Sequence, residues 1–165
     1  MAITTATGAK YYIGGTTEIP YASGDAAAIT AFKALTWVEI GEVEDGGEFG
    51  DESSDVTFQS LSDGRVRHLK GARDAGTIAL VVGDDPLDAG QIALRNAEKT
   101  KFQYNFKIEY EDAPSADFSN SVDYFRGLVM SFRKNVGEGD NVLRRTANIG
   151  INTVILTEEP EDTTP

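Results

Sequence analysis

The sequence predicts a mainly β protein, a β-sandwich or partial barrel with one flanking α-helix. Several segments alternate apolar and polar residues with the period of two that a half-buried strand requires. Glycine is frequent, at 17 of 165 residues, which suits many turns between strands. Only residues from about 86 to 99 combine a capping pattern with helical spacing. We expect a single domain over residues 1–165.

The composition excludes several functions. A net charge of −12 and a pI near 4.4 argue against a surface for nucleic acids, which requires clustered Lys and Arg. The chain has no cysteine, so disulfides and thiolate chemistry are absent. Met1 to Lys10 lack the basic start and apolar centre of a signal peptide, and no apolar run approaches a membrane span. We expect a soluble intracellular product without a membrane partner.

The N-terminal part predicts two strands. Ala9 to Ile13 form a short strand candidate that ends at a glycine pair. Residues 16–34 are loop-like, although residues 25–35 could hold a helical turn after an aspartate cap. Residues 36–44 alternate apolar and polar side chains and therefore predict a second strand.

Residues from about 46 to 74 predict a long charged loop region. Its first half is acidic and nearly devoid of large apolar residues. Ser62-Asp63-Gly64 separates two alternating runs, which is typical of a hairpin turn. Since the basic residues follow an acidic run, complementary contact between subunits is the favoured interpretation. The residues expected in that contact are Glu48, Asp51, Glu52, Asp55, Arg65, Arg67, Lys70 and Arg73.

An apolar run from Gly76 to Gly83 precedes the predicted helix. We expect Asp85 as the N-cap, Pro86 at the first helical position, and Asp88 as a further capping residue. Basic residues in the last turns suit the negative end of the helix dipole.

Three further strands follow the helix. Residues 101–112 alternate, with aromatic and aliphatic side chains on one face and polar ones on the other. Residues 123–134 predict the next strand. Residues 141–157 predict a last strand of about 50 Å at 3.3 Å per residue, long for an isolated domain. The acidic residues 158–165 predict a flexible tail.

Catalytic residues, a cofactor site and a metal site are not expected. His68, the single histidine, lies in a predicted strand without a nucleophile elbow nearby. The carboxylates of residues 42–55 lack the spacing of a calcium loop. No glycine loop leads into Lys-Ser/Thr, so a phosphate site is not predicted either.

Three elements between Thr36 and Asp112 resemble a known family. They are Trp37 to Gly41 opening a strand before a long loop, the strand from Thr77 entering the helix, and the alternating strand after it. In this order and spacing they resemble the tail tube protein (major tail protein) of long, non-contractile-tailed bacteriophages and related gene transfer agents.

The resemblance implies six copies in a ring, strands joined into a shared inner β-barrel, and rings stacked into a negatively charged tube for DNA ejection. The loop at 46–74 would reach a neighbouring ring and be disordered before assembly. Implied partners are the chain itself, tape measure protein and viral DNA in the lumen, and baseplate or distal tail and tail terminator proteins at the ends. The protein would be a virion component made in the bacterial host cytoplasm.

A DNA conduit should offer few cations that hold phosphate. Polar strand positions are the lumen-facing candidates: Glu39, Glu109, Glu111, Thr146, Asn148 and Asn152. The alternative is that they face solvent or a neighbouring subunit. If the last strand lines the lumen, Arg144 and Arg145 should lie near its rim or in ion pairs.

Two other functions remain open at this point. One is a different phage virion β-module, such as a tail terminator, a capsid decoration domain or an adhesion domain. The other is a small hydrolase, which would need His68 buried beside a carboxylate and a nucleophile.

Overall fold

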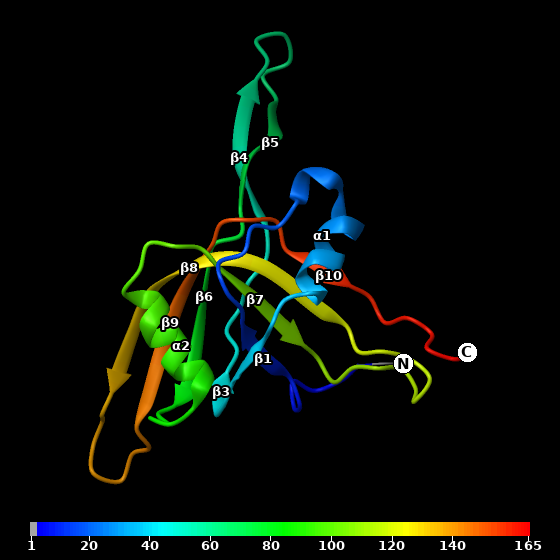
Figure 1. Ribbon diagram of the computed structural model, residues 1–165. Coiled ribbons are helices and arrows are strands. Elements are labelled where there is room, and N and C mark those ends of the chain that lie inside the picture. Colours follow the sequence, from blue (N-terminus) through cyan, green and yellow to red (C-terminus); the bar gives the residue numbers. More distant parts are fainter. Residues whose placement is uncertain (1–2) are drawn as a thin grey trace.

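The computed structural model describes residues 3–165, so Met1 and Ala2 of the expected domain lie outside the described residues. The described residues form ten strands, two α-helices and one 3-10 turn (Figure 1). The helical elements are η1 (Tyr21–Ser23), α1 (Asp25–Lys33) and α2 (Ala89–Glu98). The strands are β1 (Lys10–Ile13), β2 (Val38–Ile40), β3 (Val43–Asp45), β4 (Glu52–Gln59), β5 (Val66–Asp74), β6 (Thr77–Gly83), β7 (Tyr104–Glu109), β8 (Val122–Asn135), β9 (Arg144–Ile151) and β10 (Leu156–Glu158).

Eight strands form one antiparallel sheet in the order β2-β1-β7-β8-β9-β6-β3, with β10 also paired to β8. β2 and β3 lie at opposite edges of this order, although only Gly41 and Glu42 separate them in the chain. Because two residues span only about 10 Å, the sheet must curl until its edges approach each other. The prediction of one strand over residues 36–44 is therefore wrong, because two separate strands, β2 and β3, occupy this segment. Glu42, with φ of 57°, turns the chain between the two strands.

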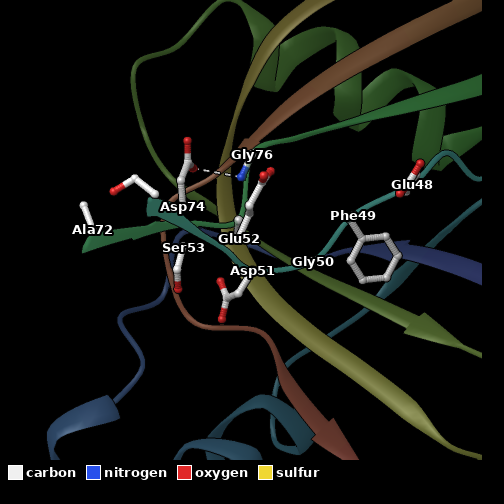
Figure 2. Close-up of a pocket in the computed structure, with 11 residues that line it drawn as sticks. Glu48, Phe49, Gly50, Asp51, Glu52, Ser53, Ala72, Asp74 and Gly76 are labelled. Carbon is white, nitrogen blue, oxygen red and sulfur yellow. Dashed lines mark hydrogen bonds between the residues drawn. The ribbon is translucent and has the colours of Figure 1, made fainter. Parts of the chain in front are cut away.

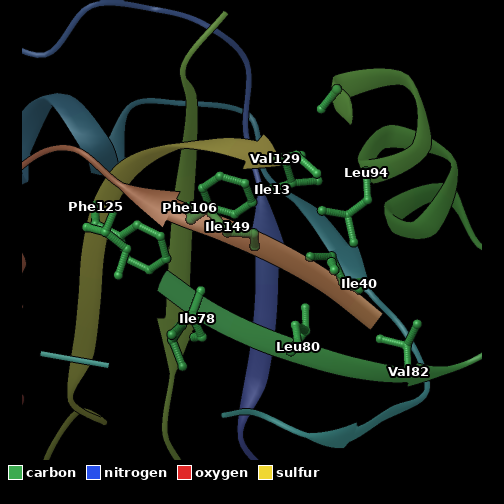
Figure 3. Close-up of a cluster of buried hydrophobic side chains, with 14 of the residues drawn as sticks. Ile13, Ile40, Ile78, Leu80, Val82, Leu94, Phe106, Phe125, Val129 and Ile149 are labelled. Carbon is green, nitrogen blue, oxygen red and sulfur yellow. The ribbon is translucent and has the colours of Figure 1, made fainter. Parts of the chain in front are cut away.

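The main core fills the inside of this curled sheet (Figure 3). Inward residues of β6 and β9 alternate with outward ones, as the period of a strand requires. Leu94 and Ala97 of α2 complete the core from the flank. The core side chains that are almost fully buried include Ile13, Ile78, Leu80, Val82, Leu94, Ile108, Phe125 and Ile149. The predicted mainly β fold with a helix on its flank is confirmed in this respect.

A second helix, α1, corrects the prediction of one helix. Phe32 of α1 is fully buried and stacks on Tyr124 of β8, with ring centroids 5.1 Å apart. The ring of Trp37 also stacks on the Phe32 ring, with the two ring centroids 6.4 Å apart. The helical turn considered for residues 25–35 is confirmed as α1, but its N-cap is Gly24, without a side-chain cap, instead of an aspartate. The sequence pattern was weak because only two residues of the helix, Ala28 and Phe32, are buried.

The helix α2 begins three residues later than predicted, at Ala89 instead of Pro86. Its N-cap is Asp88, which accepts a hydrogen bond from the Gln91 amide at 2.9 Å. The predicted N-cap, Asp85, instead accepts from Leu87 N–H at 3.0 Å in the preceding turn. Asp88 also accepts from Gly41 N–H at 3.1 Å, so contact with the β2–β3 link determines where the helix starts.

The C-terminal region departs from the predicted long strand at 141–157. β9 ends at Ile151, the next residue donates its amide to the carbonyl of Arg126, and the chain then pairs again with β8 as β10. The end of the chain lies along the 117–119 loop: Ser119 donates to the carbonyl of Glu161 at 2.9 Å, and Thr163 donates to that of Asp117 at 2.7 Å. Two strands replace the expected one because the polar stretch after Ile151 interrupts the pairing.

Candidate assembly surfaces

The β4–β5 hairpin forms a sheet of its own that projects from one end of the molecule (Figure 1). The predicted hairpin turn is confirmed: Gly64 has φ of 65° and donates its amide to the carbonyl of Ser60 at 2.8 Å. Between residues 51 and 74, every residue except Ser53, Ser60 and Gly71 is exposed. An isolated two-stranded hairpin is marginally stable in water, so this one is suited to a partner surface.

The two faces of the hairpin differ in polarity. Val56 lies opposite Leu69 and Phe58 lies opposite Arg67, which places three exposed apolar side chains on one face. The other face carries both polar and apolar side chains. On it, Nδ1 of His68 lies 2.8 Å from a carboxylate oxygen of Asp55. His68 is thus an exposed residue of the hairpin, without the buried environment that a hydrolase would need.

The charged candidates of the hairpin are partly paired with each other. Arg67 contacts Asp63 at 2.8 Å, and Arg73 contacts Asp51 at 2.9 Å. Arg65 and Lys70 have no ion pair within residues 3–165. Exposed pairs of this kind stabilise a fold little, because water and salt screen them. Their charges therefore remain suited to contact with another molecule.

The base of the hairpin holds an open cavity of about 690 Å³ between residues 48–54 and 72–76 (Figure 2). Phe49 anchors this base, with its ring centroid 6.2 Å from that of core residue Phe125. Glu52 and Asp74 lie beside the cavity, and Asp74 accepts from Gly76 N–H at 2.8 Å. Within the described residues, no three potential ligands converge on a metal position.

A second candidate surface is the outer face of β6, β9 and β8. Thr146 and Asn148 lie on it, because their neighbours Ala147 and Ile149 point into the core. Asn148 donates to the Ser131 hydroxyl at 3.1 Å. Small or uncharged side chains dominate the rows around them: Thr77, Ala79, Val81, Leu128, Ser131 and Gly150. Asn152, also exposed, lies just beyond the end of β9 beside a groove of about 310 Å³.

The other lumen candidates lie on the opposite half of the curled sheet. Tyr12 of β1 pairs with both Glu39 and Lys107, so these three side chains share the outer face of β2, β1 and β7. Glu109 pairs with Lys10 on the same face, and Glu111 follows β7 as an exposed residue. This face carries mixed charge, with Lys107 Nζ 4.1 Å from the Tyr12 ring centroid. The six candidates therefore divide between two faces that point away from each other.

A family model for the phage tail tube protein matches residues 1–152. The chain belongs to the phage tail tube protein family. Its role is structural, as a tail tube component of the virion. No curated protein matches this tail tube protein in sequence.

Solved structures share the fold of this tail tube protein at low sequence identity. A chain of the bacteriophage SPP1 tail tube is 15% identical, with a TM-score of 0.63, and the match covers 94% of this chain and 78% of that one. A chain from the sheath/tube terminator structure of the PVC extracellular contractile injection system is 9% identical, with a TM-score of 0.61 over 94% and 96%. A chain from the anti-feeding prophage baseplate structure is 12% identical, with a TM-score of 0.60 over 96% and 98%. These neighbours come from polymeric tail and injection assemblies.

Both arginines at the start of β9 lie in ion pairs in this tail tube protein. Arg145 contacts Asp84 at 2.9 Å, and Lys134 contacts the other oxygen of the same carboxylate at 2.8 Å. The hydrogen bond from Lys134, followed by that from Arg145, lowers the pKa of Asp84 below its ordinary value. Arg144 donates to both carboxylate oxygens of Glu44. Each of the three cations at this end of β8 and β9 thus has an acidic partner, although Lys134 and Arg145 share the single charge of Asp84.

Three buried polar residues of the tail tube protein were not predicted. Gln91 is fully buried, accepts from Asp85 N–H at 3.1 Å, and donates to the carbonyls of Gly41 and Gly83. Asn105, expected to point outward, is fully buried and donates to two carbonyls of the 15–17 loop. Arg126 is 5% exposed and contacts Glu18 at 2.6 Å. Their sequence positions gave no signal, because the loops that cover them come from distant parts of the chain.

The described part of the tail tube protein contains no helix with the length and apolar character needed to cross a membrane.

Proposed function

We propose that this protein polymerises as stacked six-membered rings that form a negatively charged tail tube for DNA ejection. The single observation that carries the proposal is an open, curled sheet with one uncovered outer face and unpaired edges, in a member of the tail tube family. Exposed strand edges invite aggregation in an isolated molecule, whereas a barrel shared between subunits removes them.

Two sheet edges are suited to join neighbouring subunits. β7 pairs with β8 only as far as Gly127, whereas β9 pairs with β8 up to Asn135. Within residues 3–165, no strand pairs with the other edge of β8 beyond Gly127. The opposite end of the sheet is the short strand β3, which pairs only with β6. Pairing the β8 edge of one copy with the β3–β6 edge of the next would continue the sheet around a ring.

We assign the lumen to the outer face of β6, β9 and β8. Its small and uncharged side chains, including Thr146, Asn148 and Asn152, offer phosphate no firm contact. Two cations are the exceptions on this face: Arg133, near the end of β8, and Arg144, at the start of β9, whose charge is paired with Glu44. Glu39, Glu109 and Glu111 lie on the other half of the sheet and then face solvent or a neighbouring subunit.

The hairpin is the arm proposed to reach another copy, within a chain that acts as one domain over residues 1–165. Its charged residues supply the inter-subunit contacts named from the sequence: Glu48, Asp51, Glu52, Asp55, Arg65, Arg67, Lys70 and Arg73. Tape measure protein and viral DNA would occupy the lumen, and baseplate or distal tail and tail terminator proteins would bind the tube ends. The protein would be made in the host cytoplasm and act without catalysis, cofactor or metal.

A tail terminator is the second candidate function, because the fold also resembles a chain from a sheath/tube terminator structure. A terminator would form one ring that caps a tube, whereas a tube protein stacks ring upon ring. At 9% identity this similarity supports the shared fold and does not distinguish a tail terminator from a tube protein.

Negative-stain microscopy of the purified protein at rising concentration tests the proposal. Hollow tubes with six-fold cross-sections are the expected result. A matched variant should carry proline for Ser131, because proline cannot continue the strand pairing of β8 and should block ring formation. Single rings that never stack would favour the terminator. Specific binding to a capsid or a glycan, without rings, would favour a decoration or adhesion domain.

A further inference from the structure

Met130 is an extra residue in the pairing of β8 with β9. Val129 lies opposite Ile149 and Ser131 lies opposite Asn148, so the register shifts at Met130. Such a bulge leaves one residue unpaired and changes the direction of its side chain. Met130 is 61% exposed, whereas its neighbour Val129 belongs to the main core. The bulge therefore presents a thioether at the surface in the middle of β8.

The thioether lies against Gly150 on the outer face of the sheet. A Cβ at position 150 would point to this face, because Ile149 and Ile151 belong to the core. It would lie 3.7 Å from Cγ and 3.9 Å from Sδ of Met130, which is ordinary van der Waals contact. The Met130 side chain thus uses the space that glycine leaves, beside the groove of about 310 Å³ that Leu128 also lines.

All sulfur in this protein belongs to methionine. The sequence has two methionines, Met1 and Met130, and no cysteine. In many proteins a cysteine thiolate is the first group to react with a peroxide, because the thiolate is the stronger nucleophile. Here no thiolate competes. Within residues 3–165, the Sδ atom of Met130 is therefore the one sulfur that an oxidant meets, and it is exposed.

We propose that Met130 is an oxidation site, at which hydrogen peroxide forms the sulfoxide and weakens the joining of neighbouring copies through β8. In this step a lone pair of Sδ forms a bond to one peroxide oxygen and the O–O bond breaks. The hydroxide that leaves takes up the remaining proton as water, so the sulfur loses two electrons and the peroxide gains them. A methionine sulfoxide reductase reverses the step with two thiols, which become a disulfide as water is released.

The place of Met130 in the sheet connects its oxidation with assembly. β7 pairs with β8 only as far as Gly127, and the edge of β8 that we assigned to the ring junction begins after this residue. A strand of the next copy at this edge would bring its own outer-face side chains beside Met130, because opposed side chains contact each other. The sulfoxide is polar, so it fits an apolar contact less well than the thioether. The inference rests on the proposed ring junction and adds the side chain through which an oxidant loosens it.

Treatment of the purified protein with hydrogen peroxide tests the inference. Peptide mass spectrometry should show the gain of an oxygen at Met130, at a rate within about threefold of methionine in an unfolded peptide. The oxidised protein should have a critical concentration for tube formation about fivefold higher, which is the contribution of one favourable side-chain pair between strands. Sedimentation measures this concentration. A sulfoxide reductase with a thiol reductant should return it to the original value.

Two variants assign the effect to this side chain. Met130→Leu lacks the thioether at this position and keeps Met1, so treated and untreated samples of this variant should have the same critical concentration. Met130→Gln carries a polar side chain of similar length, and without peroxide it should assemble like the oxidised original protein. Circular dichroism and thermal unfolding should show that every sample keeps the fold.

The outcomes distinguish the inference from the proposed function. If the untreated protein forms tubes and oxidation changes the critical concentration less than about twofold, the inference is overturned and the tube remains. Peroxide that impairs Met130→Leu as strongly as the original protein overturns it as well. So does a Met130 that reacts more than about tenfold slower than a peptide methionine. An untreated protein that forms neither rings nor tubes at the highest soluble concentration counts against the tube assembly itself, whereas the mass spectrum still decides the oxidation site.

Discussion

Replacing Asp84 by asparagine removes one negative charge between two cations while keeping the shape of the side chain. The Asp84 side chain is 3% exposed, and it contacts Lys134 and Arg145 at 2.8 and 2.9 Å. Loss of one member of a fully buried ion pair costs about 3–5 kcal/mol, and an exposed pair is worth about 0.2–1 kcal/mol. Because the cations are 40% and 18% exposed, we expect an intermediate loss in the free energy of unfolding, about 2 kcal/mol.

Urea or thermal unfolding of the unassembled protein measures this loss. For a chain of 165 residues, about 2 kcal/mol corresponds to a fall in Tm of about 4–8 °C. Asp140→Asn is the matched control, since that carboxylate lies in the exposed loop and should change Tm little. The Asp84 variant should also retain more DNA at low salt, because Lys134 and Arg145 are left without their counter-charge.

The pH dependence gives the sign of the same effect. The pKa of Asp84 is lowered in the folded protein, first by the hydrogen bond from Lys134. Its stabilisation is therefore present above the ordinary carboxyl pKa and is lost as the pH falls through the lower folded pKa. The difference between the original protein and the Asp84 variant should shrink in that acidic range. A difference below about 0.5 kcal/mol at neutral pH, or one unchanged down to pH 2, would refute the reasoning.

Three further changes have expected outcomes. Gly90→Ala should lower the free energy of unfolding by about 2 kcal/mol or more, because the new Cβ would lie 2.5 Å from Ile40 Cα and the backbone must move. Thermal unfolding measures this loss, and an unchanged Tm would contradict it. Phe32→Ala should cost about 3–5 kcal/mol and shift the fluorescence of Trp37, which stacks on that ring; unaltered emission would exclude this packing. Amides of residues 46–74 should exchange rapidly in the monomer and become protected on assembly, whereas strong protection in the monomer would contradict the predicted disorder.

The strands of the sheet could be predicted because their pattern is local. In β6 and β9 the apolar residues recur at every second position and are the ones that reach the core. The hairpin turn at Gly64 was likewise predictable, since a turn with positive φ favours glycine. These features depend on neighbouring residues, which a single sequence displays directly.

Contacts between distant segments could not be predicted in the same way. Asp88 is the N-cap of α2, and its carboxylate also accepts a hydrogen bond from Gly41, which is far away in the sequence. Asn105 was expected on a polar face, yet the 15–17 loop folds over it and accepts both of its amide hydrogens. The sequence also could not show that the six lumen-facing candidates lie on two different outer faces, because only the strand order assigns each residue to one half of the sheet.

The two-residue link between β2 and β3 has a mechanical consequence. Gly41 is held on both sides, by Asp88 through its amide and by Gln91 through its carbonyl. These two hydrogen bonds fix the β2–β3 link, where the two edges of the curled sheet meet, to the start of α2. We therefore expect the sheet of one subunit to resist opening and shearing. If such rigid subunits form a flexible tail, the tail must bend at the contacts between subunits. We therefore expect the curvature of the tail to come from hinge-like movement of the hairpins rather than from deformation of the sheet.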